Sequence, residues 1–245
     1  MRGFSPRRNV FSTWVDHVSF GYDIVEAIRP QKVVELGAYN GMSYFAFCQS
    51  MIENNVNGLC YAIDTWGGDD HTGEYDDSIL KDVRQHAREN YRGISYLLKM
   101  LFNDAVAHFD DESIDLLHID GLHTYDAVQE DFNTWYPKVT PGGIILFHDI
   151  EARQSDFGVW KYWSELESQH QTFAFHHGFG LGVLRKPGGD RSDPQHPLLE
   201  LLFTGSEEER HKLRLLYIHN SEYIEARNKA KRLANRPNQG GHGKK

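Results

Sequence analysis

The feature that most constrains the fold of this 245-residue chain is a repeated alternation of short apolar runs with longer helical patterns. Five runs rich in β-branched and large apolar residues are typical of buried strands. They span residues 32–36, 58–63, 94–100, 114–119 and 143–147. Helical spacing separates them over residues 42–52, 79–90 and 125–136. Strands that alternate with helices predict a parallel sheet with helices on both faces.

The flanking segments complete the predicted architecture. Apolar residues recur at helical spacing over residues 11–29, which predicts an N-terminal helix that either packs on the sheet or covers a bound ligand. Residues 172–175 and 180–184 predict an antiparallel edge hairpin. We therefore expect an α/β, doubly wound, Rossmann-like, mostly parallel seven-stranded sheet within residues 1–190. A helical C-terminal extension over 191–234, predicted as several short helices, and a disordered tail over 235–245 should follow.

Composition excludes several classes of protein. The net charge of −9 argues against a general nucleic-acid binder, because such proteins present a basic face. We find no apolar stretch long enough to span a membrane and no signal peptide. The two cysteines, Cys48 and Cys60, lie in apolar contexts, which favours free thiols and a reducing compartment. We therefore expect a cytoplasmic protein.

A glycine turn follows the first predicted strand. It runs from Gly37 to Gly41 and precedes a helical pattern, as in nucleotide-binding α/β units. The dinucleotide fingerprint G-x-G-x-x-G is not present, and Glu35 precedes the turn by two residues. A carboxylate at this strand tip would repel a pyrophosphate and attract an ammonium group. The turn therefore favours a ligand that carries a cation over NAD.

Polar side chains end the later strands. Asp64 ends the second strand, where α/β nucleotide sites hold ribose hydroxyls, and Asp120 ends the fourth. His148 and Asp149 end the fifth, and His123 follows Asp120 by three residues. Because the carboxyl ends of parallel strands share one edge, these side chains can converge there. Clusters of carboxylate and imidazole bind divalent metals, and a histidine suits general-base chemistry.

The same side chains also have simpler structural interpretations. Asp64 and Asp120 could cap helices, His148 and Asp149 could cap a turn, and His123 could bond a loop carbonyl. The polar loop over residues 65–77 offers Trp66 as a stacking surface for a flat ring, or it could be solvated. A basic stretch near residues 227–236 could likewise be a solvated helix face or a contact with a partner.

The motifs together resemble a known family. The Glu35-x-Gly37-x-x-x-Gly41 turn, Asp64, the Asp120-Gly121-x-His123-x-Tyr125 segment and the His148-Asp149 pair are similar to those of class I S-adenosylmethionine-dependent methyltransferases. More narrowly, they resemble the branch that O-methylates sugars and related small molecules in macrolide-sugar, aminocoumarin and cephamycin pathways. The resemblance covers about residues 11–186.

The resemblance implies roles for individual residues. The cofactor would be S-adenosyl-L-methionine, bound by residues of the turn and of the strand ends: Glu35, Gly37, Ala38, Tyr39, Gly41, Asp64, Thr65, Trp66, Asn103, Asp104 and Asp120. His123 would act as general base, while Asp120 and Asp149 would hold a cation or the substrate diol. Some relatives hold a divalent metal, and the matching positions are Asp120, His148 and Asp149. Magnesium or manganese would be the candidates. Because His148 departs from the all-carboxylate pattern that magnesium prefers, three alternatives stay open: manganese, iron or zinc as the metal, a His148 that is not a ligand, or no metal.

The expected function is O-methylation of a hydroxyl on a sugar or glycan precursor. Two alternatives stay open at this stage: another acceptor or another chemistry on the same scaffold, and a non-catalytic ligand-binding module attached to glycan machinery. We expect a small-molecule or glycan substrate, no nucleic acid and no membrane span. A homo-oligomer or a glycosyltransferase partner also stays open.

Overall fold

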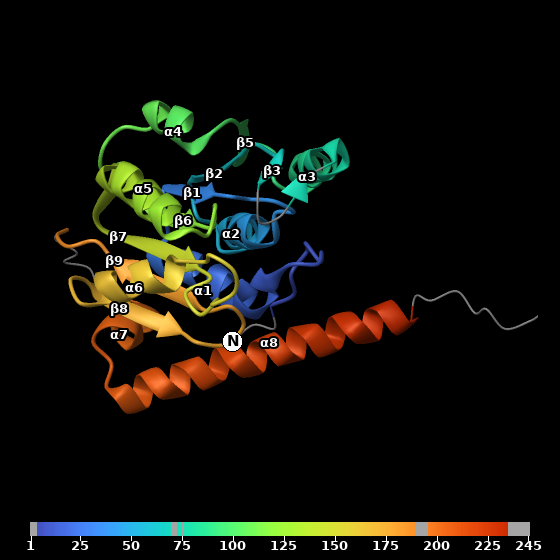
Figure 1. Ribbon diagram of the computed structural model, residues 1–245. Helices are drawn as coiled ribbons and strands as arrows, with labels where there is room; N and C mark the ends of the chain where they lie inside the picture. Colours follow the sequence, from blue (N-terminus) through green and yellow to red (C-terminus); the bar gives the residue numbers. More distant parts are fainter. Residues whose placement is uncertain (1–3, 70–72, 75, 190–195, 235–245) are drawn as a thin grey trace, which may run out of the picture.

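The computed structural model describes residues 4–69, 73–74, 76–189 and 196–234, and its centre is one seven-stranded sheet (Figure 1). The strand order is β5-β2-β1-β6-β7-β9-β8. Five strands are parallel: β1 (Lys32–Leu36), β2 (Leu59–Asp64), β5 (Ser95–Lys99), β6 (Ile114–Ile119) and β7 (Val139–His148). β9 (Leu181–Arg185) pairs antiparallel with both β7 and β8 (Gln171–Phe175). The predicted α/β sheet with an antiparallel edge hairpin is confirmed.

Helices cover both faces of the sheet. The longer ones are α1 (Val18–Ile28), α2 (Met42–Glu53), α3 (Asp77–Asn90), α5 (Tyr125–Trp135), α6 (Val159–Glu167), α7 (Pro197–Phe203) and α8 (Glu207–Ala234). Short elements are η1 (Thr13–His17), α4 (Phe102–Ala105), η2 (Val106–His108), η3 (Tyr136–Lys138) and the two-residue strands β3 (Gly68–Asp69) and β4 (Gly73–Glu74). Neither β3 nor β4 was expected in the polar loop.

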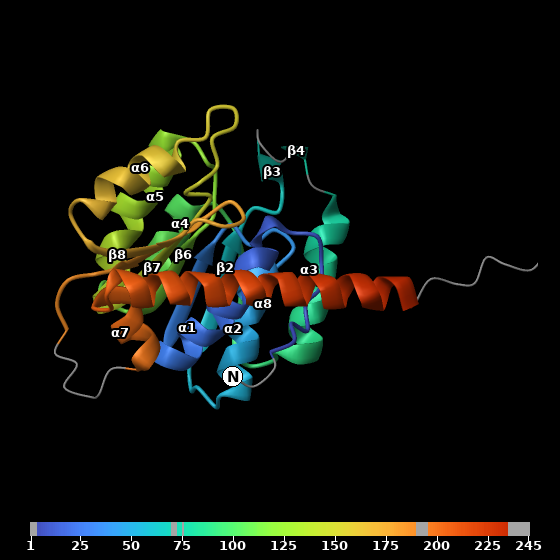
Figure 2. The ribbon, with the colours of Figure 1, turned by 90° about the horizontal axis from the view of Figure 1, so that it is seen from below.

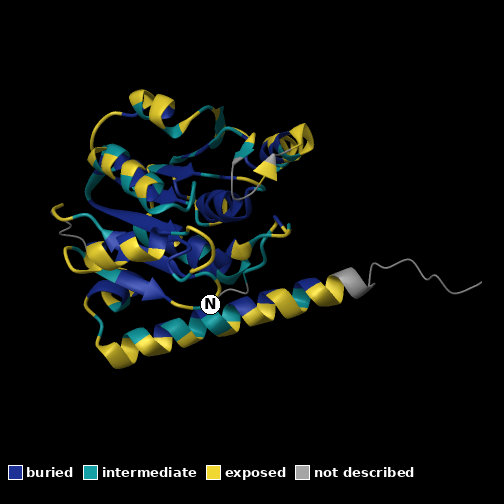
Figure 3. Ribbon diagram, viewed as in Figure 1, coloured by how far each residue is buried: buried dark blue, intermediate teal, exposed yellow. Residues whose placement is uncertain are grey.

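Side-chain alternation along the strands creates two separate cores. In β1, Val33 packs with α1 and α2 on one face, whereas Val34 and Leu36 pack with α5 and α6 on the other. Figure 3 shows the strands as the buried layer between the helices. Cys48 and Cys60 are both buried free thiols in the first core, as predicted.

The N-terminal helix is divided into η1 and α1. Ser12 caps η1 by accepting a hydrogen bond from the backbone N–H of Trp14 at 3.1 Å. The Trp14 indole is buried, and its Nε1 donates to Nε2 of His118 on β6 at 3.1 Å. A Cβ at Gly21 would lie 2.7 Å from the Trp14 ring, so only glycine allows this packing. This element therefore packs firmly on the sheet.

The C-terminal extension differs from the expected series of short helices. After α7, residues Glu207–Ala234 form one continuous helix that runs across the molecule beside α1 (Figure 2). Leu213, Tyr217 and Ile224 pack into the core that also holds α1 and α2, and the Tyr217 hydroxyl donates to Asp23 at 2.8 Å. The predicted boundary at residue 190 stays a prediction. The predicted tail over 235–245 lies outside the described residues, and none of the described helices has the length and apolarity needed to cross a membrane.

Stability prediction. Gly37 has a φ of +87°, and a Cβ there would lie 1.9 Å from the carbonyl oxygen of Asp120. Gly93 has a similar φ of +90°, but a Cβ there would meet nothing within 4 Å. Gly93→Ala should lower the free energy of unfolding by about 1–2 kcal/mol through backbone strain alone. Gly37→Ala should lower it by roughly 1–3 kcal/mol more, because its surroundings must also move. Urea denaturation of both variants measures the difference, and equal losses would contradict the close contact.

Candidate functional site

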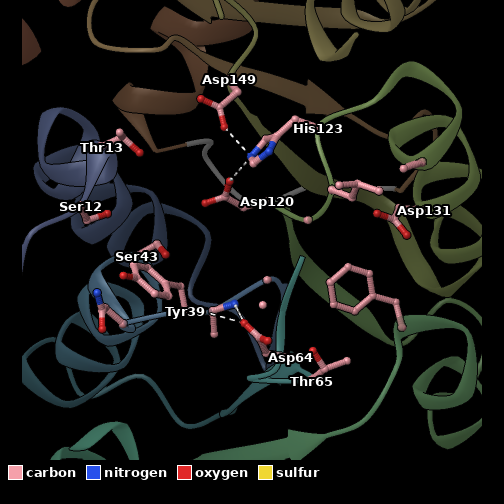
Figure 4. A pocket seen from close by; sticks show the side chains of 18 of the residues that line it. Ser12, Thr13, Tyr39, Ser43, Asp64, Thr65, Asp120, His123, Asp131 and Asp149 are labelled. Carbon is pink, nitrogen blue, oxygen red and sulfur yellow. Dashed lines mark hydrogen bonds and ion pairs between the residues drawn. The ribbon is translucent and has the colours of Figure 1, made fainter. Parts of the chain in front are cut away.

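A cavity of about 520 Å³ opens at the carboxyl ends of the parallel strands (Figure 4). Its walls come from the turns after β1, β2, β6 and β7, from the start of η1 and from α5. This is the edge where open α/β sheets bind ligands. The volume lies within the range of small-molecule and cofactor sites.

The glycine turn and Asp64 form one unit on the cavity wall. Oδ2 of Asp64 accepts hydrogen bonds from the backbone N–H groups of Ala38 at 3.0 Å and Tyr39 at 2.9 Å. Oδ1 accepts from the N–H of Trp66 at 2.6 Å. The carboxylate therefore fixes the turn after β1 against the turn after β2. Asp64 thus holds two turns together and caps none of the described helices, and it also lines the cavity.

Three residues other than glycine have left-handed backbones where the strands end at the cavity. They are Tyr39 with φ +40°, Trp66 with φ +48° and Asp149 with φ +62°. Such conformations cost about 1–3 kcal/mol each and persist where the surrounding structure enforces them. At Asp149 the conformation accompanies a side chain that faces the cavity.

Asp120, His123 and Asp149 form an acid–imidazole cluster at one end of the cavity (Figure 4). Nε2 of His123 lies 2.8 Å from Oδ2 of Asp149 and 3.8 Å from Oδ1 of Asp120. From the sheet side, Nδ1 of His148 lies 3.3 Å from Asp120 and 3.1 Å from Asp149. Two imidazoles thus share two carboxylates.

This arrangement shifts the pKa of every member. Burial lowers the pKa of His123, but its hydrogen bonds and ion pairs with Asp120 and Asp149 outweigh burial and raise the pKa to about 9. For His148, burial is likewise outweighed by the two carboxylate charges, which raise its pKa to about 10. Burial alone would raise the pKa values of both aspartates, but the imidazoles hold them below the ordinary value. Near neutral pH the cluster therefore holds two carboxylates and two imidazolium groups.

The loop before α6 fixes the His123 ring. Phe157 stacks on the imidazole with ring centroids 4.5 Å apart and an angle of 8° between the planes. The backbone N–H of Gly158 donates to the carbonyl oxygen of His123 at 2.8 Å, and Thr124 forms an isolated β-bridge with Phe157. Gly158 allows this contact, since a Cβ there would lie 2.4 Å from the nitrogen of Tyr125. The His123 imidazole is thus held by the Phe157 ring against its face and by the two carboxylates at its Nε2.

Nine of the sequence-predicted site residues line the cavity: Gly37, Ala38, Tyr39, Asp64, Thr65, Asn103, Asp120, His123 and Asp149. Five do not: Glu35, Gly41, Trp66, Asp104 and His148.

The side chains of four of these five residues lie outside the cavity, in different surroundings. Glu35 is fully buried on the α2 side of β1, where Oε1 accepts from the Ser43 hydroxyl at 2.6 Å and Oε2 lies 3.4 Å from Nδ1 of His118. Trp66 is buried, and its indole donates to the carbonyl of Tyr39 at 3.0 Å, so its ring supports the turn. Asp104 is exposed on α4. His148 lies behind the cluster.

The structure adds His123 to the predicted metal set. Among the described residues, Asp120, His123 and Asp149 have ligand atoms that all lie within 4.8 Å of one another. His148 reaches the same two carboxylates from inside the protein, and its Nε2 is buried without a hydrogen-bond partner.

Sequence reasoning missed much of the remaining wall. Ser12 and Thr13 line the cavity, as do Phe102, Glu130, Asp131, Gln154, Phe157 and Phe179. One signal was available for Asp131. It occupies the apolar face of α5 between Val128 and Trp135, and an acid on a buried helix face calls for an explanation. Ser12, Gln154, Phe157 and Phe179 lie outside the helices and strands, and Thr13, Phe102 and Glu130 lie on helices without a sequence signal for the cavity.

The cavity wall is rich in acidic side chains. Five carboxylates line the cavity, namely Asp64, Asp120, Glu130, Asp131 and Asp149, and the described part of the lining contains no lysine or arginine. Such a wall repels phosphates and attracts cationic groups. The predicted preference for a ligand that carries a cation therefore rests on the whole cavity, whereas Glu35 lies outside it.

Comparison with known proteins finds similarity to methyltransferases. Residues 34–150, which run from within β1 through β6 to the cluster, match a family model described as a methyltransferase domain. An uncharacterized protein of Sinorhizobium fredii is 43% identical over 173 residues, which are 71% of this chain but 19% of the relative. The chain thus spans about a fifth of the length of that relative.

Solved structures match in fold. A putative caffeoyl-CoA O-methyltransferase from Staphylococcus aureus has a TM-score of 0.56 at 13% identity, over 73% of this chain and 85% of that one. The O-methyltransferase TomG from Streptomyces achromogenes, solved in complex with S-adenosylmethionine, has a TM-score of 0.54 at 13% identity, over 75% and 83%. Residues 34–150 of this chain are therefore similar to a methyltransferase domain, and the sheet that contains them has the fold of known O-methyltransferases.

Proposed function

We propose that this chain transfers a methyl group from S-adenosylmethionine to a hydroxyl of a small molecule, a sugar or a glycan precursor, with His123 as general base. The observation that carries the proposal is the position of the Asp120–His123–Asp149 cluster in the same cavity as the Gly37 turn. A donor site and a proton acceptor thus face one enclosed space.

The cavity wall suits the proposed methyl donor. S-adenosylmethionine carries an ammonium and a sulfonium group, and it lacks the phosphates of a dinucleotide. The five carboxylates of the wall complement these cations. When bound, the donor would supply a methyl group on a positively charged sulfur. Tyr39 and Asp64 would face its ribose, since they bring the turns after β1 and β2 together.

The same charge pattern narrows the acceptor. The two imidazolium groups already pair with Asp120 and Asp149, so a phosphorylated acceptor, such as a nucleotide sugar or a coenzyme A ester, would meet three further carboxylates and no described lysine or arginine in the lining. A neutral polyol suits the wall better. Ser12, Thr13 and Gln154 offer hydrogen-bonding groups, and Phe157 and Phe179 offer apolar faces. This combination of polar groups and rings favours a sugar hydroxyl as the acceptor.

His123 would take the proton that the acceptor hydroxyl loses as its oxygen bonds to the methyl carbon. The bond between that carbon and the sulfur would break, and the thioether S-adenosylhomocysteine would leave. Asp149 orients the imidazole through Nε2, and Phe157 prevents the ring from turning. The two carboxylates stabilise the imidazolium that forms. Their charges also keep His123 protonated in the free protein near neutral pH, so the base becomes available as pH rises or as a cationic ligand enters. In-line alignment of donor and acceptor would supply the remaining reduction of the activation barrier.

A divalent cation is compatible with the cluster. Asp120, His123 and Asp149 would hold it, and two carboxylates with an imidazole suit manganese better than magnesium. A bound cation would supply Lewis-acid chemistry that lowers the pKa of the acceptor hydroxyl. His123 cannot be a cation ligand and the proton acceptor through the same nitrogen. We propose the base role because the imidazolium groups already balance both carboxylates.

Ligand prediction. S-adenosylmethionine and S-adenosylhomocysteine should raise the melting temperature of the protein, and NAD should not. A ligand at a hundredfold excess over its Kd stabilises by about 2.7 kcal/mol. For a chain of this size that corresponds to roughly 5–10 °C. A thermal-shift scan measures it. If NAD stabilises the protein and neither adenosyl compound does, the proposed function is wrong.

Base prediction. His123→Gln retains a hydrogen-bonding side chain opposite Asp149 but cannot accept the proton, so it should lower kcat by about 10²–10⁴-fold. Its affinity for S-adenosylhomocysteine should change little, because the cofactor is held elsewhere. The matched control is His211→Gln, at an exposed position on α8, which should keep full turnover. Turnover with labelled donor and a panel of sugars and glycans gives kcat, and calorimetry gives the affinity. Undiminished kcat in His123→Gln would exclude the base role.

pH prediction. Only the neutral imidazole accepts a proton, and the pKa of His123 is raised to about 9. Below that pH the neutral fraction rises about tenfold per unit, so kcat/KM should climb through neutral pH and level off near pH 9. Asp149→Asn removes one of the charges that raise this pKa, so its profile should level off at lower pH. A kcat/KM that is flat between pH 6.5 and 8.5 in the unmodified protein would contradict the assignment.

A further inference from the structure

Asp131 is the one carboxyl group of the cavity wall without a partner among the described residues. Its side chain is buried, with 8% of the residue exposed, and it lines the cavity from α5. No hydrogen bond or ion pair holds it in the described structure. Its neighbour Glu130, by contrast, accepts from Nδ2 of Asn103 at 2.7 Å. A buried carboxyl without a donor is costly, which indicates that a ligand completes the site.

The surroundings of Asp131 have a specific shape. A Cβ at Gly121 would lie 2.6 Å from the ring of Phe102 and 3.1 Å from Oδ2 of Asp131, so the aromatic ring and the carboxyl meet at this glycine. Phe102 and Asn103 follow β5, the outer strand beyond β2. Figure 4 shows Asp131 across the cavity from Ser12 and Thr13. This corner offers one aromatic surface and one hydrogen-bond acceptor.

We propose that Asp131 accepts a hydrogen bond from the exocyclic amine of the adenine ring of S-adenosylmethionine, with Phe102 against that ring. The inference rests on the proposed function and assigns its base-recognition residue to α5. Asp104, one of the residues that the family resemblance placed in the cofactor site, is exposed on α4 and does not line the cavity.

The position of the corner and the acceptor character of Asp131 favour the exocyclic amine over the other hydrogen-bond donors of the ligand. The Gly37 turn and Asp64 lie at the ends of β1 and β2, so the amino-acid and ribose parts would occupy that region and direct the base toward β5. A flat ring suits the Phe102 corner, and an ionised carboxylate can only accept. A base with a carbonyl at that position would be repelled. Burial, helped by the charge of Glu130, raises the pKa of Asp131 to about 7, so the carboxylate is available at slightly alkaline pH.

Calorimetry at pH 8 with two ligands tests the assignment. One is S-adenosylhomocysteine, and the other is the same compound with a hydrogen in place of the exocyclic amine. The unmodified protein should bind the amine-bearing ligand about tenfold or more tightly, because a hydrogen bond to a charged group is lost in the other. Asp131→Ala should bind both ligands equally, and Asp131→Asn should keep part of the preference through its carbonyl oxygen. The matched control Asp104→Ala should retain the full preference.

The melting temperature of the ligand-free variants separates recognition from a structural role. Asp131→Asn removes no bond of the described structure and lowers the cost of burying a charge, so its melting temperature should stay unchanged or rise. A decrease, with the ligand preference retained, would assign Asp131 to the fold and overturn the proposal. An equal affinity of the unmodified protein for both ligands would also overturn it. If the unmodified protein binds neither ligand, the proposed function itself fails.

Discussion

The backbone contact between Gly37 and Asp120 is the constraint on which the rest of the site depends. The N–H of Asp120 donates to the carbonyl of Leu36 at 2.9 Å, and the N–H of Gly37 donates to the carbonyl of Ile63 at 2.9 Å. Three strand ends are thereby tied together at one point. Since the carbonyl of Asp120 occupies the space of a side chain at residue 37, only glycine allows the turn after β1 to lie directly beside the cluster after β6. The proposed donor site and the proposed proton acceptor become neighbours for this reason.

Electrostatics then defines what this site can accept. The cluster holds two carboxylates against two imidazolium groups, and the remaining wall adds three further carboxylates. A cationic cofactor entering such a cavity improves its charge balance, and by its own charge it would lower the pKa of His123 toward the range in which the base is neutral. The proposed binding of the donor and the proposed activation of the acceptor would thus be linked through one set of charges.

The sequence predicted the sheet and the strand ends because these follow from local patterns. Apolar runs gave the five parallel strands, and the polar residues just beyond them gave Asp64, Asp120 and Asp149. The direction of a side chain within a strand covered on both faces could not be predicted, because apolar residues occupy both sides. Glu35 therefore points toward α2 and pairs with His118, although its position in the chain is adjacent to the turn.

The parts that depend on tertiary packing were predicted least well. α8 forms one helix because Leu213, Tyr217 and Ile224 dock on the core, although its sequence is strongly charged between these contacts. The loop residues Phe157 and Phe179 reach the cavity only through the folded chain. Asp131 could have been noticed as an acid on an apolar helix face, but its place in the cavity depends on Gly121 and Phe102.

A crystal structure of the protein with S-adenosylhomocysteine tests the central claim most directly. The account predicts that the homocysteine part lies along the Gly37 turn, that the sulfur faces the Asp120–His123–Asp149 cluster, and that the base lies at the Phe102 corner. Ligand density outside this cavity, or a ligand in the reverse orientation with its base against His123, would contradict the account.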